Sequence, residues 1–109
     1  MIILLRQRAS VREINQAKKD FADYIKIVVD VKRKILAAGG KLHTDGEKIL
    51  LDSGSKQENL WGGGLDLATG NIDTQAVINI RPLDKNDSME ILDPEKRKRF
   101  LTIAQKILK

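Results

Sequence analysis

Residues 43–64, HTDGEKILLDSGSKQENLWGGG, hold the chain's only histidine, His43, and its only tryptophan, Trp61. Two helix-start signatures occur in this stretch, beginning at Thr44 and Ser55, and three consecutive glycines end it. Helix starts and glycines are typical of the irregular segments that separate regular elements. We therefore expect residues 43–64 to form a shaped surface between two segments of a sheet.

The sequence before this stretch predicts a strand, a helix and a hairpin. Residues 2–5 are a short apolar run typical of a buried strand. A Ser-x-x-Glu capping box and apolar residues at helical spacing predict a helix over 11–23. Alternating apolar and polar residues predict a strand over 25–31, and a returning strand over 35–38 follows a basic turn. One long helix over 11–38 is the alternative, which the β-branched residues disfavour.

The central stretch itself predicts a helix and then a single helical turn. Thr44 begins a second capping box, and Gly54 is placed to end the helix in the left-handed conformation. A strand over 48–52 is the alternative. The pattern that starts at Ser55 predicts one further helical turn. The glycines at 62–64 either allow a tight backbone conformation or make this segment flexible.

The C-terminal part predicts three more strands and a last helix. Strands over 65–68 and 75–81 flank a turn, and a short strand over 89–91 follows a polar loop. An Asp-Pro pair gives the basic C-terminal helix a strong start. The order is then β-α-β-β-α-β-β-β-α. We predict a single α+β domain over residues 1–109, with a mostly antiparallel sheet covered by helices.

Composition limits the classes of function. The chain has 109 residues, 41% of them hydrophobic, and no cysteine, so disulfides and thiolate chemistry are excluded. The apolar run at the N-terminus is too short for a signal peptide or a membrane span. We therefore expect a cytoplasmic protein with no membrane partner. With one histidine and no cysteine, neither a metal site nor a cofactor is predicted.

Charge is distributed unevenly along the chain. Residues 1–41 carry a net +6, residues 42–93 a net −6, and the last sixteen residues a net +5. The two basic segments either shield the acidic middle or meet an anionic partner. Arg97 and Lys98 are the candidate nucleic-acid-binding residues of the last helix. The basic turn at 32–34 would extend the basic face that they form.

The last helix alone predicts only weak nucleic-acid binding. Four consecutive basic residues, 96–99, fan around more than half of a helix, so only two or three can face one phosphate backbone. We therefore expect nucleic acid to be an unlikely partner, with no appreciable binding to generic duplexes at about 150 mM salt.

Five residues are candidates for a small-ligand site: His43, Lys56, Gln57, Trp61 and Arg81. Trp61 is expected either to plug the core at one end of the sheet or to form the floor of a pocket. In the second case its polar neighbours would bind a small anionic ligand.

Several segments together resemble a known family. They are GGKLH at 39–43, EKILLDSGSKQENLWG at 47–62, INIRP at 78–82 and SMEILDP at 88–94. In these segments the chain resembles a family of small prokaryotic proteins of unknown function. The resemblance implies a stand-alone domain without an assigned activity, and it carries no catalytic residues.

The leading hypothesis is a small binding or protein-interaction domain. A homodimer is expected because the edges of a short sheet need covering. The alternative is a small hydrolase- or transferase-type enzyme with its pocket near His43, Trp61 and Arg81. His43 would then act as the base, and Lys56 or Arg81 would hold an anion.

Overall fold

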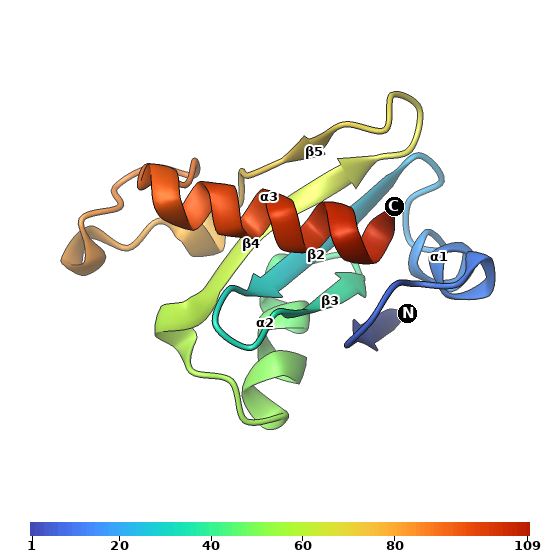
Figure 1. The fold of residues 1–109 in the computed structure, drawn as a ribbon, viewed down its shortest axis with the longest axis horizontal. Helices are drawn as coiled ribbons and strands as arrows, with labels where there is room; N and C mark the ends of the chain where they lie inside the picture. The colour runs from blue at the N-terminus through green and yellow to red at the C-terminus, as the bar shows by residue number, and fades with distance from the viewer.

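The computed structural model describes residues 1–109 and contains one five-stranded sheet in the order β1-β3-β2-β4-β5 (Figure 1). Every neighbouring pair of strands is antiparallel. The strands are β1 (Ile2–Leu5), β2 (Tyr24–Asp30), β3 (Ile35–Gly39), β4 (Leu60–Asp66) and β5 (Ile72–Asp73). The helices are α1 (Val11–Ala17), α2 (His43–Asp52) and α3 (Pro94–Leu108). This confirms the α+β class, and the predicted order matches except between β4 and α3.

The sheet is covered on both faces. Helix α3 crosses one face and α2 covers the other (Figure 1). Alternate residues of β2 face opposite sides, so Ile27 joins the larger core cluster with Phe100 of α3, while Val28 joins the smaller cluster with Leu50 of α2. Helix α1 packs Ile14 against the α3 side. Both faces of β2 are therefore buried, which explains its nearly continuous apolar sequence.

Strand β4 is longer than the sequence predicted, because the three glycines belong to it. It pairs with β2 over its whole length. A Cβ at Gly63 would lie 2.1 Å from the carbonyl oxygen of Asp73, and one at Gly64 would lie 1.7 Å from the hydroxyl of Tyr24. The glycines allow this close packing, so the prediction of a strand over 65–68 alone was wrong.

Three helix predictions need correction. The first helix ends at Ala17 instead of residue 23, and a strand follows it, which excludes one long helix over 11–38. The second helix begins at His43 with Leu42 at the N-cap and no side-chain capping bond, so the capping box predicted at Thr44 is wrong. The strand alternative over 48–52 is wrong because these residues lie within α2.

Two predicted helix boundaries are confirmed: the glycine that ends α2 and the Asp-Pro pair that starts α3. Gly54 follows α2 with a φ of +107°, the left-handed conformation that glycine adopts readily. Asp93 caps α3 by accepting from the amides of Glu95 and Lys96, and Pro94 occupies the first turn.

The segment between β5 and α3 contains none of the predicted strands. Residues 75–81 include a short 3-10 helix, η2 (Val77–Asn79), and residues 89–91 make only an isolated bridge between Glu90 and Gln75. Two buried side chains order this segment instead. Asn79 bonds backbone groups of Gly62, Thr74 and Met89, and Asn86 bonds those of residues 79, 88, 90 and 92.

No helix in this structure combines the length and the apolar character that crossing a membrane requires.

Candidate functional site

The turn between β2 and β3 carries three consecutive basic residues, Lys32, Arg33 and Lys34. The buried carboxylate of Asp30 accepts from the amides of Lys32 and Arg33 at 2.9 and 2.8 Å. The Arg33 guanidinium donates to the hydroxyl of Ser55 at 2.8 Å. These bonds hold the turn in one conformation and leave the two lysines exposed.

The connection between β1 and α1 supplies two more cations, Arg6 and Arg8. It is attached to the C-terminal end of α3, since the amide of Ala9 donates to the carbonyl of Ile107 at 2.8 Å. Arg8 also donates to the carbonyl of Lys109 at 2.5 Å. The connection therefore meets the C-terminal end of α3 on its way to α1 (Figure 1).

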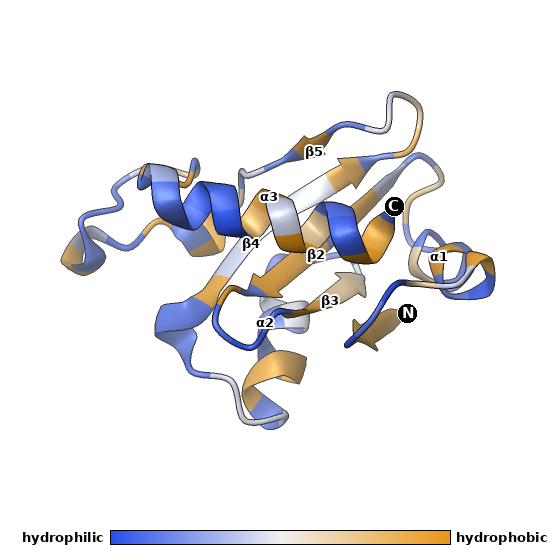
Figure 2. Ribbon diagram, in the orientation of Figure 1, coloured by the Kyte–Doolittle hydropathy of each residue, from blue (hydrophilic) through white to orange (hydrophobic).

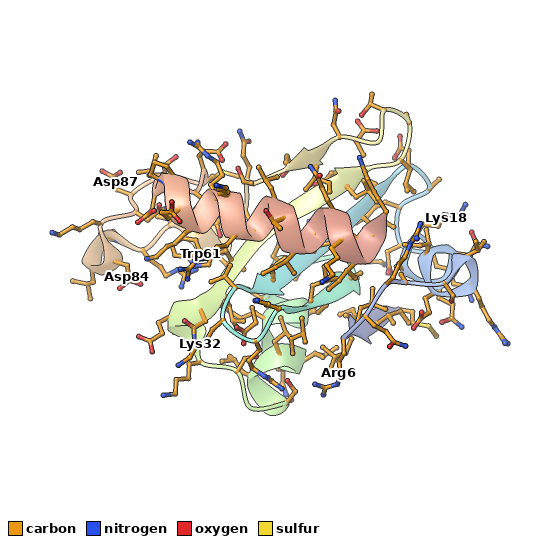
Figure 3. All side chains as sticks on the ribbon, in the orientation of Figure 1. Arg6, Lys18, Lys32, Trp61, Asp84 and Asp87 are labelled. Carbon is orange, nitrogen blue, oxygen red and sulfur yellow. The ribbon has the colours of Figure 1, made fainter.

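Together with α3, these segments enclose a groove of about 1160 Å³, hereafter the basic groove. Helix α3 contributes Lys98, Arg99 and Lys106 to it. In total eight Lys and Arg line the basic groove, against one acid, Glu95. Figure 2 shows hydrophilic residues both on the β2–β3 turn and on the first turns of α3. Figure 3 labels Arg6 and Lys32, which belong to two of the three segments that form the walls.

The positive charges of the basic groove have no acidic partners within the protein. The structure contains two ion pairs, between the N-terminal amine and Asp20 at 2.7 Å and between Lys48 and Asp52 at 3.3 Å. Neither involves a residue of the basic groove. The basic segments therefore form no direct ion pair with the acidic middle of the chain.

Of the two nucleic-acid candidates from the sequence, Lys98 lines the basic groove and Arg97 does not. The basic turn at 32–34 joins the groove, as the sequence analysis suggested. Arg6 and Arg8 were missed, because only the tertiary packing of β1 and α3 brings them beside the other cations.

Trp61 lies on the α3 face of β4 and is 1% exposed, so it is part of the core. The guanidinium of Arg81 lies 3.9 Å from the centre of its ring. Arg81 also donates to the carbonyls of Gln57, at 2.8 Å, and Leu60. Burial lowers the pKa of Arg81, while Asp84 and Glu47 act in the opposite direction.

A second hollow of about 320 Å³ opens beside the indole, hereafter the Trp61 pocket. It is lined by Trp61, Asp84, Lys85, Asn86, Leu92, Asp93 and Lys96. The ammonium of Lys96 lies 5.2 Å from the centre of the indole ring. The indole Nε1 is buried and has no hydrogen-bond acceptor.

His43 is the first residue of α2 and lies on the other side of the sheet. Its Nε2 is 2.7 Å from the carbonyl oxygen of Gly63, and because a carbonyl only accepts, Nε2 carries the proton. A Cβ at Gly62 would lie 3.1 Å from the His43 ring, whereas Trp61 points to the α3 face. Burial lowers the pKa of His43.

The structure thus brings three of the five small-ligand candidates together: Gln57, Trp61 and Arg81. Gln57 takes part through its backbone carbonyl, and Lys56 is exposed just before it. His43 does not share a pocket wall with Trp61, because it packs beside Gly62 on one face of β4 while Trp61 points to the other face. No cluster of three or more His, Asp or Glu side chains is close enough to hold a metal ion.

Comparison with known proteins places the chain in a family without assigning it an activity. No curated protein and no solved structure matches the sequence. Residues 3–107 match the family described as protein of unknown function (DUF5674), in agreement with the resemblance seen in the sequence. Because the match covers nearly the whole chain, this protein belongs to the DUF5674 family.

Proposed function

We propose that this domain binds single-stranded nucleic acid, with the phosphates of the strand lying in the basic groove. One observation carries the proposal. Eight Lys and Arg from three separate segments converge on one hollow, and none of them has an acidic partner in the protein. Holding so many like charges side by side without acidic partners costs electrostatic free energy, which an anionic ligand offsets.

The shape and lining of the groove favour a strand of phosphates over other anions. Its cations are spread over both walls. A polymer with regularly spaced negative groups can contact several of them at once, whereas a single small anion cannot. No aromatic residue lines it, so bases have no platform on which to stack there. We therefore expect contacts to phosphates and little dependence on sequence within the groove.

The walls are already ordered, which lowers the entropic cost of binding. The Asp30 carboxylate and the hydroxyl of Ser55 hold the β2–β3 turn, and the bond from Ala9 to Ile107 holds the opposite wall. The sequence analysis expected only two or three phosphate contacts because it was based on the C-terminal helix, α3, alone. The turn and the β1–α1 connection add five cations to those of α3.

A matched pair of double variants tests this function. Lys32→Glu/Lys98→Glu reverses two charges in the groove, and Lys18→Glu/Lys19→Glu reverses two exposed charges just after α1 (Figure 3 labels Lys18). The two variants have the same net charge. We expect the first to lose most of its affinity for a labelled single-stranded oligonucleotide in fluorescence anisotropy, and the second to keep it.

Equal loss in both variants would show that net charge, and not the groove, causes binding. A competition with polyglutamate distinguishes the class of ligand. If polyglutamate displaced the oligonucleotide at the same concentration of negative charge, an acidic protein segment would replace nucleic acid as the ligand.

We also infer that two copies associate through β1. This strand pairs with β3 on one side only, and its four residues are Ile-Ile-Leu-Leu, without the charge or proline that protects many edge strands. Antiparallel pairing of β1 with its copy would extend the sheet across the dimer. Light scattering at high micromolar concentration tests this, and a monomer there would contradict it. The cytoplasmic location stays a prediction.

A further inference from the structure

Residues that line the Trp61 pocket carry several polar groups that form no hydrogen bond within the fold. The indole Nε1 of Trp61 has no acceptor although the residue is 99% buried, and the exposed Asp84 carboxylate makes no hydrogen bond. Asp93 uses one carboxylate oxygen, Oδ1, to cap α3, so Oδ2 is free. Asn86, by contrast, is fully committed to backbone groups.

These groups together suit a neutral ligand that both donates and accepts hydrogen bonds. The two carboxylates in the wall are balanced by two ammonium groups, those of Lys85 and Lys96. A simple anion would be repelled by the carboxylates, and a simple cation by the lysines. A buried donor without an acceptor costs about 1–3 kcal/mol, so a ligand carbonyl or ring nitrogen near Trp61 would recover that cost.

The pocket also lies next to the basic groove on the same face of the sheet. Lys96 lines the pocket, and Glu95 and Arg99 of the same helix line the groove. On the sheet, Trp61 pairs with Val29, and Val31, two residues further along β2, lines the groove. A strand that leaves the groove at the N-terminal end of α3 therefore reaches the pocket directly.

We propose that the Trp61 pocket binds one nucleobase of the strand held in the basic groove, and that it favours bases with an exocyclic amino group. This inference rests on the proposed function. A base edge offers an acceptor to the indole N–H and an amino group to Asp84, the carboxylate that makes no hydrogen bond in the fold. A volume of about 320 Å³ falls within the range of small-ligand sites. The groove then supplies affinity and the pocket supplies base preference.

Free nucleosides test the pocket separately from the groove, because they carry no phosphate. Trp61 is the only tryptophan, so its fluorescence reports on the pocket wall without other contributions. We expect cytidine to change the Trp61 emission in a saturable way. Uridine, which has a carbonyl in place of the amino group, should bind about fivefold more weakly, the effect of about one hydrogen bond. No saturable change, or an equal response to both nucleosides, would overturn the proposal.

Two neighbouring aspartates provide a matched control, and Figure 3 labels both. Asp84 lines the pocket, whereas Asp87 is exposed and does not. Asp84→Ala should weaken cytidine binding about fivefold, the loss of about one hydrogen bond, and Asp87→Ala should leave it unchanged. Equal effects would show that the pocket does not read the amino group.

The failure of the pocket and the failure of the groove give different results. If the oligonucleotide binds but cytidine leaves Trp61 unaffected, the proposed function stands and the base pocket is wrong. If cytidine binds but the Lys32→Glu/Lys98→Glu variant retains full oligonucleotide affinity, the pocket stands as a nucleoside site and the groove assignment fails.

Discussion

The side-chain amide of Asn79 bonds both backbone groups of Gly62. Its Oδ1 accepts from the Gly62 amide at 2.8 Å, and its Nδ2 donates to the Gly62 carbonyl at 3.0 Å. Asn79 thus takes the place of a neighbouring strand at the end of β4 that β5 does not reach. This bond pair holds residues 74–92, which carry Arg81 and Asp84, against the sheet.

Asn79→Ala should therefore destabilise the protein strongly. The change leaves the buried backbone groups of Gly62 and two further carbonyls without partners, at a cost of about 4 kcal/mol in the free energy of unfolding. Urea denaturation measures it, with the exposed Asn71→Ala as control. A loss below about 1 kcal/mol would show that water can replace the amide.

Two glycine-to-alanine changes should differ sharply in their effect. At Gly63 a Cβ would meet the backbone oxygen of Asp73 at 2.1 Å and the ring of Phe100 at 2.7 Å, so Gly63→Ala should cost about 3 kcal/mol.

At Gly46, inside α2, a Cβ would lie 3.2 Å from a methyl group of Val28. The gain in helix propensity, about 1 kcal/mol, offsets that crowding, so Gly46→Ala should be nearly neutral. Thermal unfolding of both variants gives the comparison, and similar losses at the two positions would contradict the close packing of β4.

His43 should make stability depend on pH in a defined window. Burial lowers the pKa of His43 in the folded protein below its ordinary value of 6.5. In the window between the two pKa values the unfolded chain binds a proton that the folded protein does not. Stability should therefore be complete above pH 6.5 and fall as the pH falls through that window.

His43→Gln isolates this effect, because its amide can still donate to the carbonyl of Gly63 but does not titrate. Unfolding in urea between about pH 7 and about pH 5, above the ordinary range of carboxyl groups, should show a steeper loss for the wild type than for the variant. Parallel curves would mean that His43 titrates alike in the folded and unfolded states.

The sequence predicted those elements whose periodicity is set by burial. The alternation around Ile27 and the apolar spacing around Phe100 gave β2 and α3 nearly correctly, because each buries a defined face. Strand β4 was missed because glycine is common in turns, and only the neighbours at Gly63 and Gly64 show why side chains are excluded. The region of Asn79 was predicted as a strand from its alternating pattern, but a buried side-chain amide orders it instead.

The candidate site was predictable only in part. The basic turn at 32–34 and Lys98 are visible as runs of charge, yet their distance from Arg6 and Arg8 along the chain hides the convergence. The sequence suggests one pocket for His43, Trp61 and Arg81. Trp61 and Arg81 do lie in contact, but His43 packs on the opposite face of β4 from Trp61. His43 lies on α2, and the face of the sheet on which α2 packs is a tertiary feature that local sequence patterns do not reveal.

The salt dependence of oligonucleotide binding tests the central claim most directly. For single strands, the logarithm of the association constant falls by about 0.7 per decade of salt for each phosphate contact, so about five contacts give a slope of about −3.5. We expect this slope for the wild type and for Lys18→Glu/Lys19→Glu. For Lys32→Glu/Lys98→Glu, which loses two contacts, we expect a slope of about −2. A wild-type slope near zero, or one that the groove variant leaves unchanged, would contradict binding of phosphates in the basic groove.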